Sequence, residues 1–268
     1  MQISISNCYD SLRFALMAFP SDIAVTVESQ EKYQFNKTLA CNQYNLLVNT
    51  LLDFGVEVRF LDQTNSPTQI YTRDVGFILN DTIFISKMSE DNRQQETESL
   101  IDFVNQHNLK SYKMQEFVEG GDVFVHEDKV IIGIGERTTE NAAQEISQQL
   151  NYTGSNYRVI KAYFDLSLIH LDCAFNILDK DTCLITDGLF NADEISKFFP
   201  KVIKTPFDKT TLGPNIINLG NKTLLCSNQQ LANTLNQNGF KVIHINYEEV
   251  AKVSGGLGCS ILPILRSK

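Results

Sequence analysis

Four segments of the chain place charged or reactive side chains beside apolar runs, where burial is expected. They are YTRDVGFIL with Asp74, FVEGGDVFV with Glu119 and Asp122, LSLIHLDCAFNIL with His170 and Asp172, and SGGLGCSILPIL with Cys259. Buried polar groups without partners are costly, so these side chains must find partners in the fold. A thiol and a histidine among carboxylates are the groups that nucleophilic and acid–base catalysis use.

The histidine segment is the most informative of the four. If residues 166–178 form a strand, residues two apart face the same side, so His170 and Asp172 project together and away from Cys173. Alternatively, the two side chains form a buried pair that has only a structural role. The remaining histidines, at positions 107, 126 and 244, lie in polar or alternating contexts that indicate structural or exposed roles.

In the cysteine segment, one thiol follows a glycine-rich loop and lies at the start of a predicted apolar strand. Gly255, Gly256 and Gly258 precede Cys259, and they allow a ligand or another strand to approach the thiol. A free cysteine is otherwise a small buried hydrophobe. A zinc site from Cys259, His170 and Asp172 is conceivable, but no short ligand spacing supports it, so we expect no metal.

The carboxylates suggest the class of ligand. Glu119 and Asp122 flank two glycines that leave space beside them, although a tight turn is the alternative, and Asp74 could pair with Arg73 at a strand edge. Several carboxylates around one thiol and one histidine would repel one another unless a cation lay between them. A guanidinium is such a cation, since it suits bidentate carboxylates, and its carbon can be attacked by a thiolate.

A repeated unit must position these residues. Apolar runs at 21–27, 80–86, 127–134, 180–186 and 220–226 each follow a short polar turn and read as buried strands. Each run is followed by a stretch with helical spacing and then by a second strand, at 56–62, 109–117, 157–164, 201–207 and 241–247. Threonines 138 and 139 are expected helix caps, and Gly239 is an expected helix stop.

Five such units predict an α/β ring in one domain, residues 1–268. Any α/β protein alternates strands and helices, and an open doubly wound sheet is the main competitor. In a doubly wound fold that binds dinucleotides, a glycine-rich loop for the phosphates follows the first strand. Residues 28–34 contain no glycine, which argues against a dinucleotide site.

Composition excludes several classes of protein. Among 268 residues, 23 Lys and Arg face 32 Asp and Glu, and the net charge of −9 argues against nucleic acid as the main partner. No run is long enough for a membrane span, and residues 1–14 lack the features of a secretory signal. We therefore expect a cytoplasmic protein with six reduced cysteines and no membrane association. The oligomeric state, including a homo-oligomer, stays open.

Together the motifs resemble the guanidino-group-modifying superfamily, which has the five-bladed αβ-propeller (pentein) fold. YTRD, EGGD, ERT, HLD and a GGxGC cysteine loop occur in that family's order between Thr72 and Cys259. Each motif is weak alone, but five in order are specific and span nearly the whole chain. Members include arginine deiminases, dimethylarginine dimethylaminohydrolases, agmatine and peptidylarginine deiminases, arginine dihydrolases and amidinotransferases.

The resemblance implies a role for each site residue. Cys259 would be the nucleophile, His170 the general acid and base, and Glu119 would orient His170 and help to hold the substrate. The implied substrate-binding residues are Asp74 and Asp172 at the guanidinium, Arg93 and Arg137 as α-carboxylate clamps, and Asp122. The implied reaction passes through a covalent thiouronium adduct on Cys259 and needs neither a metal nor an organic cofactor.

The implied substrate is a small cationic guanidino compound. In the family, enzymes that act on unsubstituted guanidines generally keep His-x-Asp, and Asp172 therefore favours arginine over dimethylarginine. The chain departs from arginine deiminases, which are longer and usually read Asn-Leu-x-Phe-Thr-Arg-Asp where this chain has TQIYTRD, ending at Asp74. Dimethylarginine hydrolysis, arginine dihydrolysis and a non-catalytic binding protein on the same propeller stay as alternatives. A binding protein would not need to retain all five of Cys259, His170, Glu119, Asp74 and Asp172, so their joint presence favours catalysis.

Overall fold

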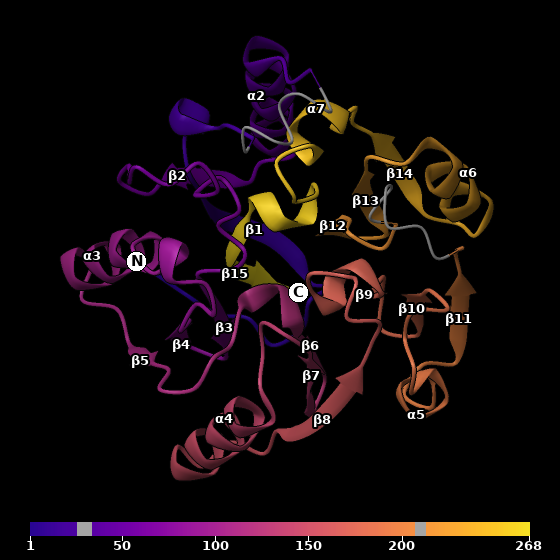
Figure 1. Ribbon diagram of the computed structural model, residues 1–268. Helices are drawn as coiled ribbons and strands as arrows, with labels where there is room; N and C mark the ends of the chain where they lie inside the picture. Colours follow the sequence, from indigo (N-terminus) through magenta and orange to yellow (C-terminus); the bar gives the residue numbers. More distant parts are fainter. Residues whose placement is uncertain (26–33, 207–212) are drawn as a thin grey trace.

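Five three-stranded sheets stand around a central axis in the computed structural model, which describes residues 1–25, 34–206 and 213–268 (Figure 1). The first sheet contains β15 (Leu262–Ser267), β1 (Ser11–Met17) and β2 (Glu57–Phe60), in that order. The second contains β3 (Gly76–Leu79), β4 (Thr82–Ile85) and β5 (Ser111–Lys113), and the third β6 (Val123–His126), β7 (Lys129–Ile134) and β8 (Arg158–Tyr163). The fourth contains β9 (Phe175–Ile177), β10 (Thr182–Ile185) and β11 (Lys201–Lys204), and the fifth β12 (Ile217–Gly220), β13 (Thr223–Cys226) and β14 (Lys241–His244).

Every sheet has the same topology. Its middle strand pairs antiparallel with the strand nearest the axis and parallel with the outer strand. A parallel pair requires a crossover, and a helix supplies it in each blade. These helices are α2 (Lys37–Asp53), α3 (Glu96–Gln106), α4 (Glu140–Tyr152), α5 (Ala192–Ser196) and α6 (Gln229–Gln237), and they lie on the outside of the ring (Figure 1). The fold is the predicted αβ-propeller of five repeated strand–helix–strand units.

Local sequence explains where these helices begin and end. The side chains of Asn36, Thr139 and Asn228 accept hydrogen bonds from backbone N–H groups in the first turns of α2, α4 and α6. Such caps satisfy donors that have no partner within the helix. Helix α6 ends before Gly239, which adopts φ of +90°, as expected for a helix stop.

The middle strands read as continuous apolar runs because both of their faces are covered. All residues of β4 and β10 are buried, and so are the first five of β7. One face packs on the crossover helix of the blade and the other on a neighbouring blade, so alternation of polar and apolar residues is lost. This is why four of the five predicted central strands, at 80–86, 127–134, 180–186 and 220–226, contain the observed middle strands.

The predicted central strand at 21–27 is wrong. Pro20–Asp22 form a short 3-10 helix, and residues 23–25 lie outside any strand, while residues 26–33 and 207–212 lie outside the described part of the chain. The middle strand of the first blade is β1, which also follows a polar turn. Pro20 lacks an N–H and presets a backbone angle suited to the first turn of a helix, which explains the difference.

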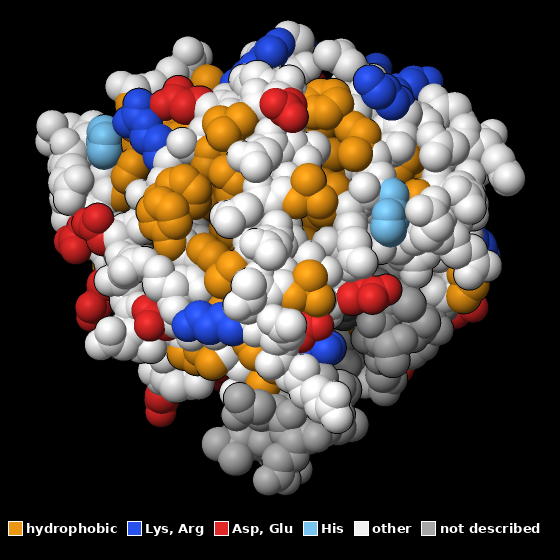
Figure 2. Space-filling view, turned by 90° about the horizontal axis from the view of Figure 1, so that it is seen from above, with side chains coloured by type: hydrophobic (Ala, Val, Ile, Leu, Met, Phe, Trp, Pro, Cys, Tyr) orange, Lys and Arg blue, Asp and Glu red, His pale blue; other side chains and the backbone are white. Residues whose placement is uncertain are grey.

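The face over α2 is partly apolar. Figure 2 shows hydrophobic side chains among charged ones on the face that is uppermost in Figure 1, where α2 lies. On α2, Leu39, Leu46 and Leu52 are among the exposed large hydrophobic residues, whereas Tyr44, Leu47 and Leu51 are fully buried. One side of this helix therefore packs on its sheet. Within the described residues, no helix has the length and apolarity needed to cross a membrane.

Candidate active site

The candidate residues meet because they occupy equivalent places in different blades. Asp74 precedes β3, Glu119 and the 3-10 helix η3 (Gly120–Asp122) precede β6, and His170 with η4 (Leu171–Cys173) precedes β9. Cys259 lies in η5 (Gly258–Ser260), before β15. All these segments lead into the strands nearest the axis, so residues as far apart in the sequence as Asp74 and Cys259 meet at one end of the ring.

Hydrogen bonds tie these entry segments together. The backbone N–H of Arg73 donates to the carbonyl of Cys259 at 2.9 Å, and that of Gly120 donates to the carbonyl of Asp74 at 3.1 Å. The Gly258 N–H donates to the side-chain oxygen of Asn215 at 2.6 Å. Because buried backbone groups need partners, these contacts fix the positions of the segments relative to one another.

A pocket at this end of the axis gathers most of the candidate side chains. Asp74, Arg93, Arg137, His170 and Cys259 all line it. The other lining residues are Thr68, Tyr71, Glu90, Ile169, Cys173, Val253, Ser254 and Gly255. At its base Asp74, His170 and Cys259 are only 1–4 % exposed, whereas the side chain of Glu90 is 45 % exposed and marks the mouth.

His170 is held by a buried carboxylate. Its Nε2 atom lies 2.9 Å from Oε2 of Glu119, and its Nδ1 atom lies 3.6 Å from Oδ1 of Asp74. Burial alone would lower the pKa of His170, but the charges of Asp74, Asp122 and Glu119 outweigh burial and raise that pKa to about 10. Burial would likewise raise the pKa of Glu119, and its hydrogen bond to His170 and the nearby arginines lower it instead to about 2. The pair is therefore an imidazolium and a carboxylate at neutral pH.

The Cys259 sulfur has donors on one side and a carboxylate on the other. The Asn215 side-chain amide donates to it at 3.1 Å and the Gly256 backbone N–H at 3.4 Å, while Oδ2 of Asp172 lies 3.8 Å away. Burial, followed by the charges of Asp172 and Asp74, raises the pKa of the thiol well above its usual value. The two donors act in the opposite direction because they favour a thiolate.

Asp74 has one carboxylate oxygen at the base of the pocket that accepts no hydrogen bond and has only a long contact with His170, at 3.6 Å. Its Oδ1 atom is buried and has no hydrogen-bond partner, whereas its Oδ2 atom accepts from Nη1 of Arg93 at 3.1 Å. Burial, together with Glu119 and Asp172, raises the pKa of Asp74 to about 6, against the opposing effect of His170 and Arg93. An unpaired buried acceptor is costly, so a donor from a ligand would relieve it.

Arg93 is already surrounded by carboxylates. Nη2 lies 2.7 Å and Nε 3.1 Å from Oε2 of Glu96, and Nη1 lies 3.5 Å from Oε2 of Glu119 in addition to its contact with Asp74. Glu96 is fully buried and also accepts from the hydroxyls of Ser66 and Thr68. Burial would lower the pKa of Arg93, but Asp74 and Glu96 outweigh it and raise that pKa above its usual value.

Arg137 lies nearer the mouth. Its Nη2 atom is 2.6 Å from Oε1 of Glu90, its Nη1 atom is 3.5 Å from the Ser89 hydroxyl, and Oε1 of Glu119 lies 3.8 Å away. The Arg137 side chain is 19 % exposed. Arg93 and Arg137 thus lie at different depths of one pocket, each beside acidic residues.

The predicted strand at 166–178 is wrong around the candidate residues His170 and Asp172, and this changes the direction in which Asp172 projects. Residues 171–173 form the 3-10 helix η4, and the strand begins only at Phe175. The alternation of a strand does not apply to a 3-10 helix, so Cys173 lines the pocket with His170. Asp172 instead lines a second cavity, while its Oδ1 atom accepts from the Cys173 thiol at 3.4 Å.

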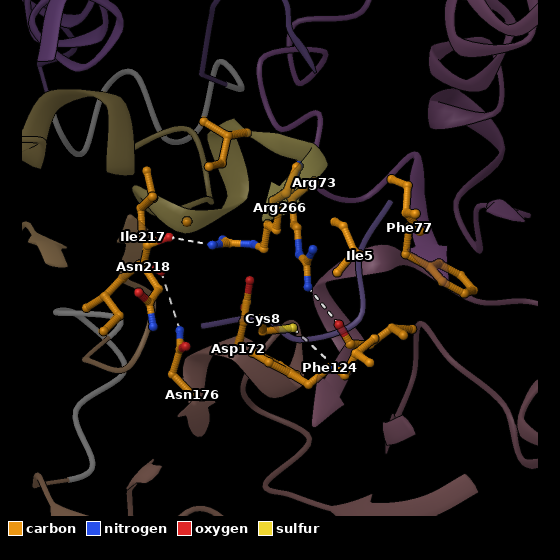
Figure 3. Close-up of a pocket in the computed structure, with 17 residues that line it drawn as sticks. Ile5, Cys8, Arg73, Phe77, Phe124, Asp172, Asn176, Ile217, Asn218 and Arg266 are labelled. Carbon is orange, nitrogen blue, oxygen red and sulfur yellow. Dashed lines mark hydrogen bonds between the residues drawn. The ribbon is translucent and has the colours of Figure 1, made fainter. Parts of the chain in front are cut away.

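This second cavity lies among the strands nearest the axis and has a volume of about 60 Å³, enough for a few water molecules. Figure 3 shows Asp172 projecting toward the side chains of Arg73 and Arg266. Arg73 donates to the carbonyl of Val123 at 2.7 Å, and Arg266 donates to that of Asn218 at 2.8 Å. Asp172 therefore lines this cavity, and its Oδ2 atom also lies 3.8 Å from the Cys259 sulfur.

Asp122 lies behind the pocket lining, with both oxygens in use. Oδ1 accepts from the Leu171 backbone N–H at 2.7 Å, and Oδ2 accepts from the Thr138 hydroxyl at 2.6 Å. Burial raises the pKa of Asp122 to about 7, although these hydrogen bonds and His170 lower it. These contacts fix the segment after His170, and Asp122 is not among the residues that line the pocket. Thr139 is the observed helix cap, so Thr138 is free for this role.

The two glycines between Glu119 and Asp122 are needed for close packing. A Cβ atom at Gly121 would lie 2.7 Å from the His170 ring, and one at Gly120 would lie 2.2 Å from the Arg73 carbonyl. Real side chains do not approach so closely, and only glycine permits the observed approach. The tight-turn alternative for EGGD is thus replaced by a 3-10 helix packed against the catalytic histidine candidate.

One group of side chains in the pocket is arranged so that it could hold a metal ion. Among the described residues, Asp74, Glu119 and His170 have potential ligand atoms within 4.8 Å of one another. These are not the three residues considered for zinc in the sequence analysis, which were Cys259, His170 and Asp172; only His170 is common to both sets. The guanidinium of Arg93 contacts both carboxylates of the set, at 3.1 and 3.5 Å, so a protein cation already compensates them.

Sequence reasoning missed Asn215, whose side-chain amide lies 3.1 Å from the Cys259 sulfur. It directly precedes the apolar run that becomes β12, which is the place that Asp74 and Glu119 occupy in their own blades. A search for one polar residue before each innermost strand would have found it. Glu96 and Glu90 were missed as well, because their importance comes from contacts with Arg93 and Arg137 that sequence spacing does not reveal.

Known proteins resemble the chain over most of its length. The family model described as N,N dimethylarginine dimethylhydrolase, eukaryotic, matches residues 14–266. An uncharacterised protein, YkgA, from Bacillus subtilis is 29 % identical over 97 % of this chain and 94 % of its own. N(G),N(G)-dimethylarginine dimethylaminohydrolase from Mycobacterium tuberculosis is 25 % identical over 83 % of this chain and 74 % of its own.

A solved structure shares the fold. The N-terminal domain of ArgZ, an arginine dihydrolase from Cyanobacteria, superposes with a TM-score of 0.83 and 19 % identity, covering 94 % of this chain and 98 % of that one. One structure of that domain is covalently bound to a reaction intermediate, and another is bound to substrate. This likeness shows the shared fold, and the match of the family model over residues 14–266 shows that the chain belongs to the N,N-dimethylarginine dimethylhydrolase family, within the guanidino-group-modifying superfamily.

Proposed function

We propose that the protein hydrolyses a guanidino C–N bond, with free arginine as substrate and citrulline and ammonia as products. The observation that carries the proposal is the buried Oδ1 of Asp74, which accepts no hydrogen bond and lies 3.6 Å from Nδ1 of His170, in a pocket that also presents Cys259. A guanidinium supplies both the N–H donors that this acceptor lacks and the positive charge that the carboxylates require.

Substrate binding prepares the nucleophile. After burial, Asp172 and Asp74 are the main causes of the raised pKa of Cys259. A guanidinium bound between these carboxylates neutralises their effect, so the thiol loses its proton to solvent when the cation arrives. Asn215 and Gly256 then stabilise the thiolate by donating hydrogen bonds to sulfur.

In the reaction that follows, His170 carries out both proton transfers. The Cys259 sulfur bonds to the guanidinium carbon, and the C–N bond to the terminal nitrogen breaks. His170 gives its proton from Nδ1, since Nε2 is held by Glu119, and ammonia leaves. His170 next takes a proton from water, which attacks the thiouronium carbon; the C–S bond breaks and the ureido product is released.

The position of Asp172 favours arginine over dimethylarginine as the substrate. Its carboxylate lies 3.8 Å from the sulfur, where it would meet the nitrogens of a bound guanidinium. Two methyl groups on that nitrogen would remove its N–H donors and leave the carboxylate unpaired, which is strongly unfavourable for a buried group. The alternatives are dimethylarginine hydrolysis, to which the family model and the Mycobacterium relative point, and dihydrolysis, as in ArgZ. A cytosolic site of action fits six cysteines that are all free.

The test measures ureido product, ammonia and methylamines from arginine, dimethylarginine and agmatine, beside the Cys259→Ser variant. Citrulline and one ammonia per arginine, both absent in the variant, are expected. Dimethylamine release exceeding ammonia release would reverse the substrate ranking, and two ammonia per arginine would indicate a dihydrolase. If no guanidine is turned over, the non-catalytic binding alternative gains the support.

A further inference from the structure

The second cavity, among the strands nearest the axis, contains two arginines that form no ion pair. Arg266 is 8 % exposed and Arg73 is partly buried, and both line this axial cavity. Across the described residues, no carboxylate oxygen lies within 4.0 Å of either guanidinium. Arg73 donates instead to the carbonyl of Val123 at 2.7 Å. Nη1 of Arg266 donates to the carbonyls of Asp10 and Asn218 at 2.7 and 2.8 Å, so neutral acceptors hold both charges.

The axial cavity has an excess of positive charge. Asp172 is the one carboxylate among its described lining residues, and it projects toward both guanidiniums (Figure 3). One negative charge thus faces two positive ones, and a buried charge without a counter-ion is more costly than a buried polar group without a hydrogen bond. Burial lowers the pKa of Arg266 to about 10, against the effect of Cys8 and Asp10. The like charge of Arg73 acts in the same direction as burial, and a further negative charge would relieve this repulsion.

Both guanidiniums have N–H groups left for a ligand, since each carries five such donors. Among the described residues, Arg73 makes one hydrogen bond through Nη2 and Arg266 makes two, both through Nη1. Water satisfies donors of this kind but supplies no charge. The cavity has a volume of about 60 Å³, and its walls include the apolar side chains of Ile5, Phe77 and Ile261. Since a few water molecules fill this volume, it has room for a halide ion or nitrate but not for an organic phosphate.

We propose that the axial cavity binds a small monovalent anion, such as chloride, through the guanidiniums of Arg73 and Arg266. Strands β6 and β15 both begin at the end of the ring where the candidate active site lies, and Arg266 is near the far end of β15. Cys8 accepts a hydrogen bond from the Val125 N–H near the end of β6, lines the same cavity and is partly exposed. The anion therefore enters from the end of the ring opposite the candidate active site. Anion binding does not depend on the proposed hydrolysis, because it involves neither the thiol nor the histidine of that site.

The experiment compares thermal unfolding in sodium chloride and in sodium gluconate, each at about 0.1 M and the same pH. The two salts have the same ionic strength, but gluconate is too large for the cavity. A ligand that binds only the folded protein raises its Tm, and chloride with a Kd of about 10 mM should raise it by about 2–3 °C relative to gluconate. Sodium bromide and sodium nitrate should act like chloride. Arg266→Gln and Arg73→Gln should each remove the difference between chloride and gluconate.

The matched control is Arg158→Gln, whose guanidinium is 61 % exposed and paired with Asp128 outside the cavity. It should keep the full difference in Tm, because general effects of the salts act on all variants alike. Equal Tm values of the wild type in the two salts, or a chloride effect that persists in both cavity variants, would overturn the proposal.

A measurement on the wild type decides the matter if neither cavity variant folds. Crystals soaked in sodium bromide should show an anomalous peak in the axial cavity beside the guanidiniums of Arg73 and Arg266. A map with no peak in this cavity refutes the proposal. Neither the unfolding nor the diffraction experiment involves turnover, so their failure leaves the proposed hydrolysis intact.

Discussion

The Nε2 atom of His170 lies 2.9 Å from Oε2 of Glu119, and both side chains are shielded from solvent. This contact commits one ring nitrogen and leaves Nδ1, which lies 3.6 Å from Asp74, for the proton transfer that we propose. It also joins two blades of the propeller, since Glu119 precedes β6 and His170 precedes β9. The same two residues therefore stabilise the fold and set the protonation state of the site.

Glu119→Gln should lower kcat by about a hundredfold, within the range that a general acid–base group contributes. Glu119 is one of the charges that raise the pKa of His170 to about 10, so its removal should shift the basic limb of the pH–kcat profile to lower pH. The profile is measured from pH 5 to 11 beside a matched control, Glu140→Gln, whose carboxylate is 46 % exposed and paired with Lys161 outside the pocket. An unshifted basic limb would contradict the assigned role of Glu119.

The ion pair between Glu119 and His170 should make the free energy of unfolding depend on pH, in a direction that follows from the two pKa shifts. The pKa of Glu119 is lowered from 4.5 to about 2, so its contribution is complete above 4.5 and is lost as the pH falls through 2. The pKa of His170 is raised from 6.5 to about 10, so its contribution is complete below 6.5 and is lost as the pH rises through 10. The difference in unfolding free energy between wild type and Glu119→Gln, measured in urea, should be largest between pH 4.5 and 6.5. A constant difference from pH 2 to 10 would refute the ion pair.

Asp74→Asn should lower kcat/KM for arginine by at least about a hundredfold, because it removes a buried charge that faces the guanidinium. In the wild type, the raised pKa predicts that kcat/KM increases with pH through about 6, as Asp74 loses its proton in the free enzyme. The variant should lack this acid limb, which a pH series on both proteins checks. An acid limb that persists in the variant would assign the ionisation to another group.

Asn215→Ala should raise the pKa of the Cys259 thiol further, because it removes the donor 3.1 Å from sulfur. Alkylation of Cys259 by iodoacetamide at pH 8, followed by mass spectrometry, should slow by about tenfold, in line with the usual strength of a hydrogen bond to a charged group. Asn233→Ala, at an exposed position on α6, is the matched control. Equal alkylation rates in both variants would exclude Asn215 as a donor to the thiolate.

The amino-acid sequence by itself determined the repeated architecture. Short apolar runs behind polar turns, each followed by a helical stripe, were enough to place four of the five middle strands and all five crossover helices. These features depend on local hydrophobic pattern and capping, which a sequence displays directly. The one misplaced middle strand, 21–27 in place of β1, lies beside Pro20, where local pattern and backbone geometry disagree.

The chemistry-bearing residues were also visible, since glycines and charged groups beside Asp74, Glu119, His170 and Cys259 interrupt apolar runs. Only the tertiary structure decided which side each faces. The 3-10 helix after His170 turns Asp172 toward the axial cavity and Cys173 toward the pocket, contrary to the alternation of a strand. The partners of the site, Asn215 for the thiol and Glu96 and Glu90 for the arginines, follow from closure of the ring, which brings distant blades into contact. Such long-range contacts have no local signal, because they arise between segments rather than within one.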